Sequence, residues 1–210
     1  MLRKIYLSLE LLALYGVVPV LLYFDIIQLY EILTLLLFFM VIMIILIFDK
    51  SFDKKDLFTF RNLRVYLPTI IDRFVLSAVV LTFITLIAVP DKFLGFAGSR
   101  PQFWIIVMIA YPMISVFPQE LIYRVFMFHR YKTLLNCPVL RILVSAIMFG
   151  WVHIVFNNIY AVVLSFIGGL IFGYTYEKSR SIGVVAFEHA LYGDFIFTIG
   201  LGTFFFKGIS

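Results

Sequence analysis

The sequence predicts an all-α membrane protein, a polytopic bundle of about seven (six to eight) transmembrane helices. The chain has 210 residues, of which 63% are hydrophobic and only 14% are charged, and its mean hydropathy is +1.08. A soluble domain carries about 25% charged residues, so the composition excludes the water-soluble classes. Apolar runs of near-spanning length recur along the chain, and the alternating pattern of a membrane β-barrel is absent from the sequence.

Seven apolar runs approach the length of about 20 residues that a helix needs to cross a bilayer. Each is expected to be helical because lipid offers the backbone no hydrogen-bond partner. The fourth run is short and contains Pro112 and Pro118, so we expect it to continue, kinked, to about Arg130. The runs are about 5–23, 27–48, 67–90, 102–117, 139–157, 159–177 and 183–206.

Lysine and arginine predict the orientation through the positive-inside rule. With the N-terminus in the cytoplasm, the loops 49–66 and 130–141 and the turn with Lys178 and Arg180 are cytoplasmic. The outer side then keeps Lys92, Arg100 and Lys207. This topology accounts for the net charge of +5 without a nucleic-acid partner. We expect one membrane domain, 1–210, surrounded by lipid in a prokaryotic cytoplasmic membrane.

Ionisable residues inside the spans are the candidate functional residues, because each costs about 2.5 to 3.5 kcal/mol at mid-helix. Four of them lie near span ends, where we expect them to snorkel or to pair with loop charges. These four are Glu10, Glu31, Asp72 and Arg73. The other candidates are Glu120, Arg124, His153, Glu188, His189 and Asp194.

The spacing of the second group predicts a shared site. Glu120 and Arg124 are four residues apart, so they share a helix face and can form an ion pair. Glu120, His153 and His189 lie 10, 12 and 9 residues from the cytoplasmic arginines of their helices. At 1.5 Å per residue they reach similar depths of about 15, 18 and 13.5 Å, which indicates a site towards the cytoplasmic side.

A carboxylate beside two imidazoles in a dry cavity can activate water for attack on an amide. Histidine, asparagine or arginine side chains can then stabilise the oxyanion. Glu120, His153 and His189 could instead hold a divalent metal such as zinc, although we expect no metal or other cofactor. The sequence has neither the His-Glu-x-x-His motif of zinc proteases nor a Gly-x-Ser-x-Gly elbow. A proton relay in a small transporter is an alternative use of the same residues.

Three ordered motifs resemble a known family. They read Gln119-Glu120-Leu121-Ile122-Tyr123-Arg124, Phe149-Gly150-Trp151-Val152-His153 and His189-Ala190-Leu191-Tyr192-Gly193, within a core of about 115–200. They resemble the Glu-Glu-x-x-x-Arg, Phe-x-x-x-His and His-x-x-x-Asn motifs of the CAAX protease and bacteriocin-processing (CPBP, or Abi) family, which includes the Ras-converting CAAX prenyl endopeptidase. Two positions depart from this pattern, because Gln119 replaces a glutamate and Gly193 replaces the asparagine.

The resemblance implies an intramembrane endopeptidase that acts on membrane-associated peptides or proteins, prenylated or bacteriocin-like. It implies that Glu120 and His153 activate the water, and that His189 and the asparagine of the third motif donate to the oxyanion. Arg124 is a further oxyanion donor that we expect from the chemistry of its side chain. Asn157, one helical turn beyond His153, is our candidate to replace the donor missing at Gly193. The remaining supporting candidates are Gln119, Phe149, Tyr192 and Asp194. The alternative is an inactive relative that serves as a scaffold or immunity protein.

Overall fold

The computed structural model describes residues 1–27, 30–60 and 62–206, and within these ranges it contains helices and no strands. Seven helical stretches in the described residues are long and apolar enough to cross a membrane. They are Leu2–Tyr23, Glu31–Phe48, Leu63–Ala88, Pro101–Arg130, Pro138–Phe156, Ile159–Ser179 and Ile182–Ile199. The predicted all-α bundle is thereby confirmed. Residues 28 and 29 of the second predicted span, and Arg61 and Lys207 of the predicted loops and tail, lie outside the described residues.

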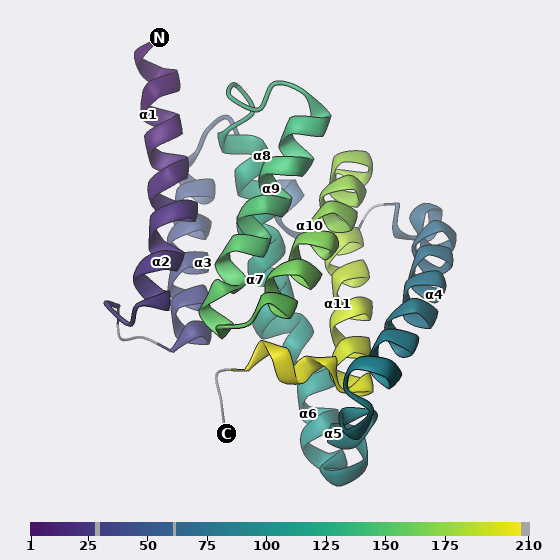
Figure 1. Cartoon of the computed structure of the whole chain (residues 1–210). Helices are drawn as coiled ribbons and strands as arrows, with labels where there is room; N and C mark the ends of the chain where they lie inside the picture. The colour runs from purple at the N-terminus through teal and green to yellow at the C-terminus, as the bar shows by residue number, and fades with distance from the viewer. Residues whose placement is uncertain (28–29, 61, 207–210) are drawn as a thin grey trace.

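The first two spans lie on one side of the bundle, and the third span lies on the opposite side (Figure 1). The first span consists of α1 (Leu2–Leu11), a π-helical turn (Leu12–Val17) and α2 (Val18–Tyr23). It is followed by α3 (Glu31–Phe48) and α4 (Leu63–Ala88). Helix α4 starts four residues earlier than the predicted run at 67. Its main packing partner among the long helices of the described residues is the last span.

The fourth span passes through the centre of the bundle (Figure 1). It consists of α6 (Pro101–Tyr111), α7 (Phe117–Glu120) and α8 (Met127–Arg130), with π-helical turns at Pro112–Val116 and Leu121–Phe126. Proline has no amide hydrogen to donate within a helix, and a widened turn is one way to accommodate it. The span therefore continues past both prolines to Arg130, as predicted. Every residue from Glu120 to Phe128 is buried, which makes this span the core of the molecule.

The fifth and sixth spans pack most extensively against each other. They are α9 (Pro138–Val152), which ends in a 3₁₀ turn at His153–Phe156, and α10 (Ile159–Ser179). Ser165, Gly169 and Gly173 are buried, and a Cβ atom built on Gly169 would lie 2.8 Å from the Ala146 Cα atom of α9. Small residues at this spacing allow the two helix backbones to approach closely.

Substitution of Gly169 by alanine is expected to destabilise the protein by about 1 to 3 kcal/mol, because the new methyl group would overlap the backbone of α9. Gly173→Ala is the matched control, since its Cβ would come no closer than 3.3 Å to Ile142 and 3.5 Å to the Cα atom of that residue. The control should change stability by less than about 1 kcal/mol, because alanine also favours the helix. Thermal unfolding in detergent measures both variants, and equal melting temperatures would contradict the close-packing explanation.

The seventh span is shorter than predicted. Helix α11 (Ile182–Ile199) stops at Gly200, whose φ of +106° is a conformation that glycine adopts readily. The prediction of one span over 183–206 is therefore wrong at its C-terminal end. A 3₁₀ turn at Leu201–Phe205 follows and runs across the ends of neighbouring helices, drawn in yellow in Figure 1.

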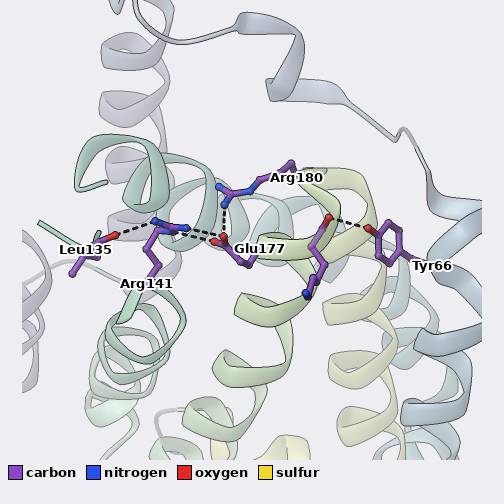
Figure 2. A network of polar contacts seen from close by, with 6 residues as sticks. Tyr66, Leu135, Arg141, Glu177 and Arg180 are labelled. Carbon is purple, nitrogen blue, oxygen red and sulfur yellow. Dashed lines mark hydrogen bonds and ion pairs between the residues drawn. The ribbon is translucent and has the colours of Figure 1, made fainter. Parts of the chain in front are cut away.

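Polar residues concentrate at the face that holds the turns after α8 and α10. Glu177 of α10 accepts hydrogen bonds from Arg141 at 2.7 and 3.0 Å and also from Arg180 (Figure 2). In the same region Tyr66 donates to the Lys178 carbonyl oxygen at 2.8 Å. The predicted cytoplasmic residues therefore gather at one face of the bundle. That this face is cytoplasmic stays a prediction.

Candidate active site

The centre of the candidate site is a hydrogen bond between two buried ionisable residues from different spans. Glu120 on α7 has no exposed surface, and His189 on α11 is 5% exposed. The Nδ1 atom of His189 lies 2.7 Å from Oε1 of Glu120. An ionised carboxylate only accepts hydrogen bonds, so Nδ1 carries the hydrogen and donates it. Glu120 thereby fixes both the orientation and the tautomer of the His189 ring.

Arg124 occupies the other side of the same carboxylate. Its Nε atom lies 3.2 Å from Oε2 of Glu120, and its guanidinium lies over the ring of Phe149 at 4.5 Å. The ion pair expected from the four-residue spacing is present. Arg124 is fully buried and does not line the cavity described below. From this position Arg124 contacts Glu120 and can hold its carboxylate in place.

His153 is held by the end of its own helix. The backbone N–H of His153 bonds to the carbonyl oxygen of Gly150, in the tighter pattern of a 3₁₀ turn. This leaves the Phe149 carbonyl without the usual helical donor. The imidazole supplies that donor, since its Nδ1 atom lies 2.6 Å from the Phe149 oxygen. A carbonyl only accepts, so Nδ1 is protonated, and neutral His153 keeps an unprotonated Nε2.

Phe149 lies between the two histidines. Its ring centroid is 4.9 Å from that of His153 and 5.5 Å from that of His189. No hydrogen bond or ion pair joins His153 to Glu120 within the described residues. Among all the residues that the structure describes, no group of three or more His, Cys, Asp or Glu side chains is placed to hold a metal ion. The alternative metal set of Glu120, His153 and His189 is therefore not assembled as a donor cluster in this structure.

A large apolar cavity reaches both histidines. Its volume is about 1150 Å³, and its walls come from the first four spans and from α9, α10 and α11. His153, His189 and Gln119 line it, whereas Glu120 does not. Most of the other lining residues are aliphatic or aromatic. A long apolar group therefore fits beside the polar site, and Glu120 is reached from the cavity through His189.

Comparison with known families identifies the region that carries this site. Residues 101–193 match the family described as Rce1-like, the type II CAAX prenyl endopeptidase Rce1-like family. This match confirms the resemblance drawn from the three motifs. Comparisons with curated proteins and with solved structures found no match.

The other supporting candidates differ in their positions. Gln119 donates to Ser115 Oγ at 2.8 Å, one turn earlier on the same span, and lines the cavity. The hydroxyl of Tyr192 lies 3.3 Å from that of Ser77 on α4, also beside the cavity. Asp194 has a buried Oδ1 atom with no hydrogen-bond partner among the described residues.

Asn157, just outside the helix that carries His153, is not brought to the Glu120–His189 pair. It adopts a left-handed backbone conformation after the 3₁₀ turn. Its Oδ1 atom accepts a hydrogen bond from Tyr23 at 3.3 Å. The early end of α9 changes the direction of the chain, so Asn157 does not continue the helix face of His153. Its predicted role as a replacement donor therefore has no support in this geometry.

Tyr111, which was not among the predicted site residues, has its hydroxyl 3.3 Å from Nε2 of His189. At about 100° per residue, positions 111 and 120 would point to opposite sides of a regular α-helix. The π-helical turn at Pro112–Val116 accommodates an extra residue and reduces that separation to about 80°. Tyr111 and Glu120 can therefore both reach His189. Pro112, directly after the tyrosine, was the available signal of an irregular turn.

A second ion pair, between a half-buried arginine and a buried glutamate, lies next to the site. Arg73 on α4 has its Nη2 atom 3.0 Å from Oε1 of Glu188 and donates to Thr175 Oγ1 at 2.9 Å. The expectation that Arg73 serves the membrane interface or a loop charge is therefore wrong. This partner could not be predicted from the sequence, because the pairing depends on where α4 docks against α11. The pair connects α4 to the helix that carries His189.

Proposed function

We propose that this protein is an intramembrane endopeptidase that cleaves lipid-modified peptides, with prenylated CAAX-type substrates as the first class to test. One observation carries the proposal. His153, with an unprotonated Nε2, and His189, hydrogen-bonded to buried Glu120, line the same apolar cavity of about 1150 Å³. The Rce1-like match over residues 101–193 supports the same reaction class.

In this proposal His153 is the general base. Its Nε2 accepts a proton from a water molecule as the water oxygen forms a bond to the peptide carbonyl carbon. The carbonyl oxygen becomes an oxyanion that needs hydrogen-bond donors. When the C–N bond breaks, the Nε2 proton passes to the leaving nitrogen, and His153 returns to its neutral form. A base held by Phe149 O at 2.6 Å has a fixed orientation for both transfers.

Glu120 acts through His189 in this scheme. The carboxylate does not line the cavity, and both of its oxygens face protein groups, His189 on one side and Arg124 on the other. The proposal therefore differs from the expectation that Glu120 and His153 together activate the water. A carboxylate on Nδ1 stabilises positive charge on the imidazole and orients Nε2, as in other buried Asp–His and Glu–His pairs. The Nε2 atom of His189 then faces the hydroxyl of Tyr111 at 3.3 Å, on the side where we place the oxyanion.

The shape and polarity of the cavity support a lipidated substrate. Aliphatic and aromatic side chains from several spans line it, so an isoprenoid or acyl chain could be buried without unpaired polar groups. The peptide bond next to the lipidated residue would then lie near the histidines. A divalent metal is not required by the steps above, and whether one binds is a question for elemental analysis of the purified protein.

Cleavage by wild type and by Glu120→Gln tests the proposal. Both proteins are purified in detergent and given a farnesylated fluorogenic peptide, an acylated analogue and the same peptide without lipid. We expect wild type to cleave the lipidated peptides, and Glu120→Gln to be at least about 100-fold slower because the His189 ring loses its charged partner. Thermal unfolding confirms that the variant is folded.

The other outcomes distinguish the alternatives. Equal cleavage by wild type and Glu120→Gln would remove Glu120 from the mechanism. The absence of cleavage by wild type on all peptides would favour an inactive scaffold or immunity protein. A proton-coupled flux in liposomes that depends on Glu120 would favour a transporter.

A further inference from the structure

Gly193 lies one helical turn after His189 on α11, and the space that its side chain would occupy is already filled. The residue is buried, and a Cβ atom built on it would lie 2.5 Å from the hydroxyl oxygen of Tyr111 and still closer to the ring. Real Cβ atoms essentially never approach other heavy atoms so closely. A glycine at this position is therefore required by the tyrosine. In the family pattern that this segment resembles, an asparagine side chain would project here.

Tyr111 is held in this space by packing on two sides. Its ring meets the ring of Phe197 edge-on at 5.1 Å and that of His189 at 6.3 Å. The hydroxyl lies 3.3 Å from Nε2 of His189 and lines the cavity. A tyrosine hydroxyl that is largely withdrawn from water generally takes a hydrogen-bond partner, and here that partner is a residue of the candidate active site.

The chain of partners from Glu120 to Tyr111 determines which groups are free to donate. Glu120 accepts the Nδ1 hydrogen of His189, so neutral His189 has an unprotonated Nε2 that accepts from Tyr111 before substrate binds. The phenolic hydrogen can rotate about the C–O bond. When an oxyanion develops in the cavity, the hydrogen can turn towards it without any movement of the ring.

We propose that Tyr111 is a catalytic residue that donates a hydrogen bond to the oxyanion, and that Gly193 provides the space for it. The inference rests on the proposed peptidase function. A single donor from another span thus replaces the donor that is missing at position 193. Loss of one oxyanion donor typically lowers kcat by about 10²- to 10³-fold.

Tyr111→Phe removes the hydroxyl and keeps the ring. On the farnesylated peptide we expect kcat to fall about 100-fold while KM changes less than about threefold, because the donor acts on the transition state. A phosphinate analogue of the substrate carries the oxyanion charge permanently, so its affinity should fall by a similar factor. Tyr15→Phe is the control, since it deletes another buried hydroxyl, bonded to Ile122 O at 3.0 Å, and Tyr15 does not line the cavity.

An exchange of the two positions gives an independent test. Gly193→Asn alone should lose activity, because the new side chain overlaps Tyr111. Tyr111→Ala combined with Gly193→Asn should recover activity above both single variants, because the asparagine amide can then donate from the vacated space.

The results separate this inference from the peptidase proposal. If wild type cleaves, Glu120→Gln does not, and Tyr111→Phe keeps kcat within threefold of wild type, the role of Tyr111 is overturned and the peptidase proposal stands. Phosphinate affinity that is unchanged in Tyr111→Phe would also overturn it. Absence of cleavage by wild type overturns both.

Discussion

Replacement of His153 by glutamine is expected to lower kcat for peptide cleavage by about 1,000- to 10,000-fold. Glutamine keeps an amide donor for the Phe149 carbonyl, so the helix end can retain its cap. It has no basic nitrogen, so no group at this position can take the proton from water. Initial rates at saturating substrate measure the effect, because the base acts in the chemical step and the apolar cavity still binds the lipid.

His129→Gln is the matched control for this substitution. The chain has three histidines, and His129 lies away from the cavity, with Nε2 3.0 Å from Oδ2 of Asp49. That hydrogen bond holds the pKa of the Asp49 carboxyl at about 2, below its usual range. Because His129 does not line the cavity, the control should keep kcat within about twofold of wild type. If His153→Gln keeps more than a tenth of wild-type activity, another group activates the water.

The membrane fold could be predicted from the sequence because it depends on local hydrophobicity. Each apolar run had to become a helix to satisfy its backbone in lipid, and the seven helical stretches follow those runs. The errors lie where one residue ends a helix. Gly200 stops α11 through a left-handed backbone conformation, although the chain beyond it remains apolar. Hydropathy contains no information on that turn.

The candidate site could be predicted only in part. The Glu120–Arg124 pair follows from a spacing of four residues within one helix. Predicting the Glu120–His189 contact required the further assumption that residues at similar depth lie close together. That assumption is correct for this pair, because His189 Nδ1 lies 2.7 Å from Glu120 Oε1. Tyr111 was missed because a π-helical turn changes which residues share a helix face. Whether Glu120 faces the cavity depends on helix rotation, which a single sequence does not specify.

Substitution of Arg124 by methionine is expected to destabilise the protein by about 3 to 5 kcal/mol. Arg124 and Glu120 have no exposed surface, so the variant leaves a buried carboxylate with the imidazole of His189 as its remaining close partner. Removal of one member of a buried ion pair has a cost of this size, because the charge that remains has no compensating partner. Methionine is flexible enough to fill the space between Phe149 and Phe172. Unfolding in detergent with increasing denaturant measures the change.

A double-mutant cycle separates loss of the charge pair from loss of packing. Arg124→Met combined with Glu120→Gln removes both charges, and we expect most of the lost stability to return. Arg130→Met is the control, since its pair with Glu10 at 2.7 Å is partly exposed and should contribute no more than about 1 kcal/mol. A double variant no more stable than Arg124→Met would show that the arginine acts through packing on the aromatic rings.

The activity of that double variant tests why two charges are buried in the centre of this bundle. A neutral pair of similar volume is expected to be nearly as stable as the ion pair. It leaves His189 without a carboxylate on Nδ1, however, so the neutral variant should be folded and at least about 100-fold less active. A stable and fully active double variant would contradict the role proposed for Glu120. A stable but inactive one would show that Arg124 is retained to hold a buried carboxylate in its charged form for the reaction.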